Sequence, residues 1–106
     1  MKKLITILFF LLTFNIYSQD ITVVHFNYKW NQTNAYKYLD RLRNVKIQYA
    51  YVEDQSDLVR KSIKSVPTIV IYKDGQPAYR LEAGLKMRIE ETIEDIQEAI
   101  NSLKIQ

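Results

Sequence analysis

Residues 23–34 read VVHFNYKWNQTN, and this stretch decides the fold that the sequence predicts. Its opening run, with Val23, Val24 and Phe26, is apolar on nearby positions, as in a central strand buried on both faces. An aromatic turn follows, and then Asn31, a good N-cap before apolar residues at helical spacing. We therefore expect a strand that leads through a tight turn to a helix N-terminus, where free amides and the helix dipole favour ligand binding.

The chain after this helix predicts a second strand over residues 45–52. Apolar and polar residues alternate there, with Val45, Ile47, Tyr49 and Tyr51 on one face. This strand should be parallel to the first, because the intervening helix would form a right-handed crossover between them.

The remainder of the chain predicts a short helix, a hairpin and a final helix. The acidic residues Glu53, Asp54 and Asp57 suit the start of the short helix, and Asp74-Gly75 marks the tight turn between strands 68–73 and 78–83. The final segment is predicted to be an amphipathic helix covering the sheet. Its apolar residues recur at spacings of four, three, four and three: Ile89, Ile93, Ile96, Ile100 and Leu103.

Three motifs resemble those of the thioredoxin family. Residues 30–34, WNQTN, are similar to its W-C-x-x-C turn, with asparagine at both cysteine positions. Residues 65–68, SVPT, resemble its cis-proline loop, and residues 69–84 resemble its closing β-hairpin. The resemblance covers residues 21–103 and implies a minimal thioredoxin-like α/β fold, a four-stranded mixed sheet with helices on both faces. It also implies a cis peptide bond before Pro67.

The first 19 residues have the pattern of a secretory signal peptide. Two lysines precede an apolar run, residues 4–14, which is too short to cross a bilayer and is followed by polar residues. We expect cleavage near Gln19, a thioredoxin-like domain over residues 20–106, and export to a bacterial periplasm or out of the cell. An uncleaved membrane anchor is the alternative.

The charge of the chain gives no reason to expect a nucleic-acid partner. The formal net charge is +3, and two lysines belong to the leader, so the mature domain carries 3 − 2 = +1. A nearly neutral domain has no basic surface for nucleic acid. No membrane contact is expected of the mature domain either.

The chain has no cysteine, which removes the redox chemistry that the resemblance would otherwise imply. Thiol–disulfide exchange proceeds by attack of a thiolate on a disulfide sulfur. We expect no metal and no cofactor, since Glu53, Asp54 and Asp57 lack the glycine and ligand spacing of a calcium loop. The protein is therefore not expected to be a thiol-dependent enzyme.

Two kinds of function fit these observations. The first is a module that binds an extended peptide or partner protein, because the family pairs substrate backbone with the residue before the cis-proline and this needs no thiol. The second is a redox-independent enzyme or small-ligand binder at the helix N-terminus, using His25, Asn31 and Asn34. A purely structural or assembly role is a third possibility. The binding module would use Trp30, Asn31, Gln32, Thr33, Asn34, Val66 and Pro67.

His25 interrupts the first strand. By the resemblance to thioredoxins, His25 takes the position of a buried carboxylate, which in that family assists proton transfer from the second cysteine. Because this chain has no thiol to serve, we interpret His25 as a hydrogen-bonded structural residue rather than a catalytic one.

The strand over residues 45–52 is expected to lie at an open edge of the sheet. Family members with an extra N-terminal strand pair it with this one, and the mature chain has too few residues before Ile21 to supply it. An open edge offers unpaired amides and carbonyls to another chain. We expect a weak homodimer through this edge, or a partner that adds a strand.

Overall fold

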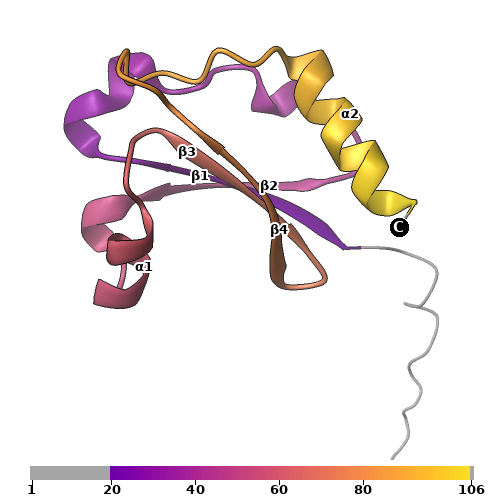
Figure 1. Cartoon of the computed structure of the whole chain (residues 1–106), viewed down its shortest axis with the longest axis horizontal. Coiled ribbons are helices and arrows are strands. Elements are labelled where there is room, and N and C mark those ends of the chain that lie inside the picture. The colour runs from indigo at the N-terminus through magenta and orange to yellow at the C-terminus, as the bar shows by residue number, and fades with distance from the viewer. Residues whose placement is uncertain (1–19, 106) are drawn as a thin grey trace, which may run out of the picture.

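Four strands form one mixed sheet in the computed structural model of the protein, which describes residues 20–105 (Figure 1). They are β1 (Ile21–Asn27), β2 (Lys46–Tyr51), β3 (Thr68–Lys73) and β4 (Gln76–Glu82). Their order is β2-β1-β3-β4, with β2 parallel to β1 and the other neighbours antiparallel. The predicted leader lies outside the described residues. Within residues 20–105, no helix is long and apolar enough to cross a bilayer.

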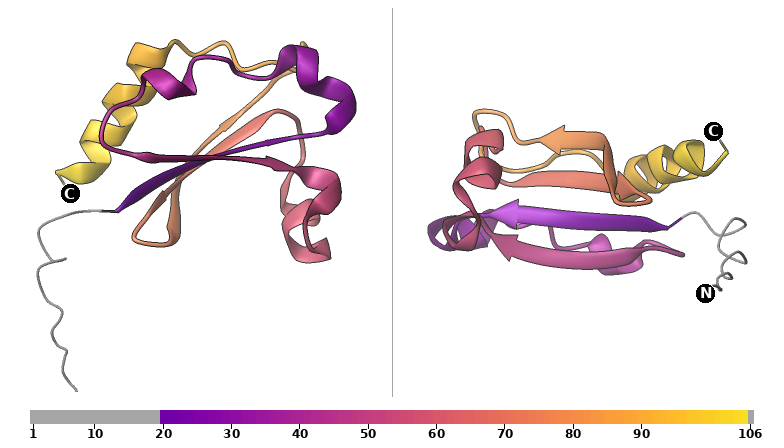
Figure 2. Two further views of the ribbon diagram at one scale, coloured as in Figure 1. Left: turned by 180° about the vertical axis from the view of Figure 1, so that it is seen from behind. Right: turned by 90° about the horizontal axis from the view of Figure 1, so that it is seen from below.

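Two α-helices lie against opposite faces of this sheet, as Figures 1 and 2 show. The first, α1 (Asp57–Ser62), lies on what we call the α1 face, and α2 (Ile93–Lys104) lies on the α2 face. Three 3₁₀ segments complete the structure: Lys29–Asn34, Leu39–Arg41 and Val52–Asp54.

Each face has its own apolar core, because apolar residues on successive positions of β1 point to opposite sides of the sheet. On the α2 face, the core joins residues of the strands to residues of α2: Ile21, Val23, Ile69, Ile71, Ile96, Ile100 and Leu103. On the α1 face, the core consists of Val24, Phe26, Val52, Ile63, Val66 and Val70. The predicted four-stranded mixed sheet with helices on both faces is confirmed.

The α-helix predicted to begin at Asn31 is wrong. The chain forms the 3₁₀ segment Lys29–Asn34, becomes extended at Ala35 (φ −61°, ψ 145°) and continues without an α-helix to β2. Asn31 is not an N-cap: it lies inside the 3₁₀ segment with φ −103° and ψ 19°. The Tyr36 N–H, which a continuing helix would direct to a carbonyl four residues earlier, donates instead to Nε2 of His25 at 3.0 Å.

The two α-helices are shorter than the apolar pattern predicts, because each begins at a capping residue. Ser56 accepts from the Val59 N–H at the start of α1. Thr92 and Asp95 form a reciprocal capping box at the start of α2, so Ile89 precedes the helix although it remains buried. The second predicted strand is also shorter, because Val52 opens a 3₁₀ segment.

The hairpin and the proline loop have the conformations that the sequence predicts. Asp74 and Gly75 both have positive φ, 52° and 85°, as a two-residue hairpin turn requires. The Val66–Pro67 peptide bond is cis. As predicted, β2 is an edge strand: β1 is its neighbour on one side, and no strand of residues 20–105 lies on the other.

Candidate binding surface

Three asparagine side chains hold the 3₁₀ segment Lys29–Asn34, which we call the Trp30 turn, together from the inside. Nδ2 of Asn27 donates to the Asn31 carbonyl at 3.0 Å, and Oδ1 of Asn27 accepts from Nδ2 of Asn31 at 3.1 Å. Nδ2 of Asn34 donates to Oδ1 of Asn31 at 2.9 Å. Asn27 and Asn31 are buried, and an unpaired buried amide would cost about 1–3 kcal/mol. The network therefore fixes the shape of the turn.

Asn31 also connects this turn to two loops that are distant in the sequence. Its Nδ2 lies 3.4 Å from the carbonyl oxygen of Val66 and 3.3 Å from that of Met87. The loop after β4 contacts the proline loop directly, because the Ala83 N–H donates to the Pro67 carbonyl at 3.1 Å. The three segments meet at one end of the sheet, where Figures 1 and 2 show the Trp30 turn beside the loop after β4.

Large apolar side chains are exposed on two of these three segments. Trp30 is 64% exposed, Leu85 is fully exposed and Met87 is 37% exposed. The Trp30 ring stacks on Tyr28, with 5.8 Å between ring centroids and 14° between ring planes. The third segment, Val66–Pro67, is nearly fully buried, so its side chains offer no surface to a ligand. We call the side chains of Trp30, Leu85 and Met87, together with the Val66–Pro67 loop, the Trp30 surface.

The predicted site residues lie on or beneath this surface, but they differ in what they can offer a ligand. Trp30, Gln32 and Thr33 expose their side chains, whereas Asn31 is buried together with the side chains of Val66–Pro67. Asn34 is partly buried and is engaged with Asn31. The Asn31 amide is used inside the protein, so Asn31 would act on a ligand by holding the turn in shape.

Sequence reasoning missed Leu85 and Met87. Both lie in the irregular segment between β4 and α2, where no strand or helix pattern explains an apolar residue. Large apolar residues in a segment without a strand or helix pattern could have indicated this part of the surface, because such residues mark either a core contact or a binding surface. Met87 has φ 58°, an uncommon conformation for a residue with a side chain, and its N–H donates to the Gly84 carbonyl at 3.0 Å.

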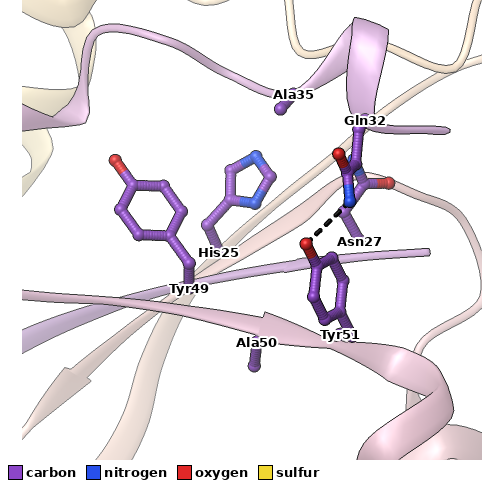
Figure 3. A pocket seen from close by; sticks show the side chains of 7 residues that line it. All are labelled: His25, Asn27, Gln32, Ala35, Tyr49, Ala50 and Tyr51. Atoms are coloured by element: carbon purple, nitrogen blue, oxygen red, sulfur yellow. Dashed lines mark hydrogen bonds between the residues drawn. The ribbon is translucent and has the colours of Figure 1, made fainter. Parts of the chain in front are cut away.

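A pocket of about 320 Å³ lies on the other side of the Trp30 turn, between the turn and β2 (Figure 3). Tyr49 and Tyr51 form its outer wall, and the Tyr51 hydroxyl accepts from Nε2 of Gln32 at 2.7 Å. The imidazole of His25 lies 5.5 Å from the Tyr49 ring, measured between centroids. His25 itself is only 3% exposed.

His25 is hydrogen-bonded within the fold, as expected. Its Nε2 accepts the Tyr36 N–H, so the imidazole is the neutral form and this nitrogen is occupied. Burial lowers the pKa of His25 below 6.5, which further favours the neutral ring. The proposed group of His25, Asn31 and Asn34 is not assembled around one opening: His25 lines this pocket, whereas Asn31 is buried within the turn.

The buried histidine predicts a specific loss of stability in mild acid. Below about pH 6.5 the unfolded chain takes up a proton on His25 that the folded protein resists, so the free energy of unfolding should fall as the pH drops toward the lowered folded pKa. The slope should approach about 1.4 kcal/mol per pH unit within that window. Urea unfolding at a series of pH values measures it.

The matched control for this prediction is His25→Gln. Glutamine can present an oxygen to the Tyr36 N–H but does not titrate, and His25 is the only histidine in the chain. The variant should have a flat profile between about pH 6.5 and 5, where carboxylates are still largely ionised. An equal slope in both proteins would show that His25 is not the titrating group.

The described residues offer no evident metal centre. Within residues 20–105 there is no group of three or more histidine, cysteine, aspartate or glutamate residues that could hold an ion. The remaining chemistry of the Trp30 surface is apolar contact and hydrogen bonding by backbone and amide groups.

Solved structures share this arrangement of strands and helices, although no protein-family model and no curated protein matches the sequence. A thioredoxin from Fasciola hepatica superposes with a TM-score of 0.58 and 21% identity, over 83% of this chain and 85% of that chain. A variant thioredoxin from Halobacterium salinarum gives 0.60 and 18%, over 82% and 77%. Thioredoxin-2, a component of the malaria parasite protein secretion machinery, gives 0.56 and 22%, over 79% and 84%.

These likenesses establish the fold. The sheet order, the cis-proline loop and the position of the Trp30 turn agree with the resemblance in the sequence, and the chain carries asparagine where the W-C-x-x-C motif has cysteine. The chain therefore has a minimal thioredoxin fold and contains no cysteine.

Proposed function

We propose that this protein is an exported, redox-inactive binding module that holds an extended peptide, or an extended segment of a partner protein, on the Trp30 surface. The observation that carries the proposal is the exposure of Trp30, 64%, on a turn whose backbone is fixed from within. Large aromatic residues in rigid, exposed positions are the usual anchors of protein interfaces.

The support beneath Trp30 limits the entropy that binding would cost. Tyr28 stacks against the indole, and the buried asparagine network fixes the turn that carries it. A side chain that is already ordered loses little conformational freedom when a ligand covers it. Leu85 and Met87 extend the apolar area onto the neighbouring loop.

The proline loop supplies the polar part of the proposed contact through its backbone. The Val66 carbonyl receives one long hydrogen bond, 3.4 Å, from Asn31. A carbonyl oxygen has two lone pairs, and in this proposal the second accepts a hydrogen bond from a peptide N–H. Backbone pairing would hold the peptide in an extended form, and the apolar side chains nearby would select which residues it carries.

Binding on this surface would be non-covalent. A thioredoxin-type enzyme can trap its substrate as a mixed disulfide, whereas this chain has no thiolate to attack one. The predicted leader would place the protein in an exporting pathway. Cleavage near Gln19 can be tested by expressing the protein with its leader, purifying it and determining its N-terminus by mass spectrometry.

The proposal predicts that bound peptides change the fluorescence of Trp30, the only tryptophan in the chain. Titration with short extended peptides that carry aromatic or aliphatic residues at alternate positions should shift its emission to shorter wavelength, because the indole leaves water. Trp30→Ala should weaken binding by about 30-fold, as expected for the loss of an aromatic hot spot.

Tyr79→Ala is the matched control. Tyr79 is 48% exposed on β4 and is not part of the Trp30 surface, so affinity measured by surface plasmon resonance should be unchanged in this variant. If no peptide shifts the emission at concentrations up to about 1 mM, or if both variants bind as the wild type does, the proposed function is wrong.

A further inference from the structure

We propose that the edge of β2 pairs with the same edge of a second copy of this chain, as antiparallel strands related by a twofold axis at Tyr49. The two sheets would then join into one continuous sheet of eight strands. This surface is separate from the Trp30 surface, and the inference does not depend on peptide binding.

The first observation is that the edge is open and apolar on one face. No strand of residues 20–105 covers β2, which Figure 2 shows as the outermost strand on its side of the sheet. Pairing with β1 places Ile47, Tyr49 and Tyr51 on the α2 face, beside Val23, His25 and Asn27. Tyr49 is 62% exposed and Tyr51 is 39% exposed. Aromatic residues this exposed on an unpaired strand favour pairing with another strand.

The second observation explains why these rings are exposed. Residues 29–45 contain short 3₁₀ segments in place of an α-helix, and the pocket of about 320 Å³ lies between the Trp30 turn and the tyrosines. Figure 3 shows both rings along the outer side of this pocket. The α2 face is therefore hollowed beside Tyr49 and Tyr51, and in the proposed dimer the neighbouring sheet extends the apolar surface there.

The third observation is the distribution of charge along the edge, which identifies a second copy as the partner. The strand begins at Lys46, whose side chain is 72% exposed, and the exposed acids Glu53 and Asp54 follow its end after the buried Val52. Antiparallel pairing of two copies brings the basic end of each strand to the acidic end of the other. Parallel pairing would place like charges together, which is unfavourable. The edge is thus self-complementary in one direction only.

Lys46 and Glu53 already have partners within the chain, and these contacts are compatible with the dimer. Lys46 lies 3.7 Å from Asp20 in an exposed ion pair, which contributes little stability. Glu53 accepts the Lys29 N–H at 3.0 Å. A carboxylate can accept several hydrogen bonds, so Glu53 can also attract the Lys46 of a second copy.

Symmetry and side-chain direction set the register. Opposite residues in an antiparallel pair point to the same face, so a twofold axis must pass through a residue position rather than between two. An axis at Tyr49 sets Tyr49 opposite itself and Ile47 opposite Tyr51, which places all three α2-face residues of β2 in the ladder. An axis at Gln48 would pair Tyr51 with Val45, which precedes the strand.

Cysteine cross-linking can test this register cleanly, because the natural chain has no cysteine. Directly opposite residues in an antiparallel pair have Cα atoms about 4.5–5.5 Å apart, within disulfide range. Tyr49→Cys should therefore form a disulfide-linked dimer under mild oxidation about tenfold faster, or more, than Tyr79→Cys on β4, because association raises the effective thiol concentration.

A second experiment keeps the Tyr49 ring in place. Gln48 lies opposite Ala50 in this register, so an equal mixture of Gln48→Cys and Ala50→Cys proteins should form the mixed dimer faster than either variant forms its own. Identical residues at these positions would be diagonal neighbours about 7–8 Å apart, beyond normal disulfide geometry. Fastest self-linking of Gln48→Cys would overturn the proposed axis.

Sedimentation of the natural sequence tests the association itself. The full gene product, purified in whatever form the host processes it to, should show a concentration-dependent dimer that dissociates in Tyr49→Lys, where two ammonium groups would face each other. Added salt should weaken the dimer, because the end charges are exposed. A protein that stays monomeric up to about 1 mM, with Tyr49→Cys linking no faster than Tyr79→Cys, would refute the proposal.

Discussion

An Ile96→Ala variant is expected to lose about 2–5 kcal/mol of unfolding free energy, the usual cost of truncating a fully buried isoleucine. Ile96 is 0% exposed and packs in the core of the α2 face, where α2 covers the sheet. A domain of 86 described residues, 105 − 20 + 1, is expected to have about 4–13 kcal/mol in total. With no disulfide to restrain the unfolded chain, this single change should leave the protein close to unfolding.

Urea unfolding followed by circular dichroism measures this loss, with Ile105→Ala as the matched control. Ile105 follows α2 and is 86% exposed, so the same chemical change there should alter the unfolding free energy by no more than about 0.5 kcal/mol. Similar losses in the two variants would mean that α2 does not pack on the sheet as described.

Asn31→Ala is expected to lower the unfolding free energy by about 1–3 kcal/mol and also to weaken peptide binding. The amide of Asn31 bonds to Asn27 and Asn34 and lies within 3.4 Å of the Val66 and Met87 carbonyls. Alanine would leave these buried groups without their partner and release the loops that carry the Trp30 surface. The same substitution at Asn101, which is exposed on α2, is the control and should change neither property.

Comparison with Trp30→Ala separates the two roles of the turn. Trp30 is exposed, so its removal should reduce binding while leaving the unfolding free energy nearly unchanged. Asn31→Ala should reduce both quantities. If Asn31→Ala unfolds at the same urea concentration as the wild type, the buried network does not hold the three segments together.

The sequence predicted the sheet well because its strands depend on local signals. The apolar run of β1, the Asp74-Gly75 turn and the proline loop each depend on properties of neighbouring residues, such as burial on both faces or positive φ. The edge position of β2 was expected from the resemblance, and within residues 20–105 no strand takes the place of the extra strand that pairs there in some family members.

The helix after Asn31 could not be excluded in the same way, because long-range contacts decide against it. Apolar spacing favours a helix there, but Asn27, Asn31 and Asn34 use their side chains to satisfy one another and the turn backbone. His25 then takes the Tyr36 N–H out of any helical ladder. The start of α2, by contrast, is indicated by a local pattern, since Thr92 and Asp95 have the spacing of a capping box.

The residues proposed for the site differ in how far local sequence could indicate their burial. Trp30 is exposed, whereas Asn31, which was interpreted as the N-cap of an α-helix, is buried inside the turn. Leu85 and Met87 were missed because their proximity to the Trp30 turn depends on the long-range contact between Asn31 and the Met87 carbonyl.

The most direct test of the proposed function is a map of backbone amide chemical shifts in the isotope-labelled protein, with and without the tightest-binding peptide from the fluorescence titration. The largest changes should fall in three segments, residues 29–34, 65–68 and 84–87, and the β3–β4 hairpin turn at Asp74-Gly75 should be unaffected. Changes confined to β2, or to the hairpin turn, would place the ligand elsewhere and contradict peptide binding at the Trp30 surface.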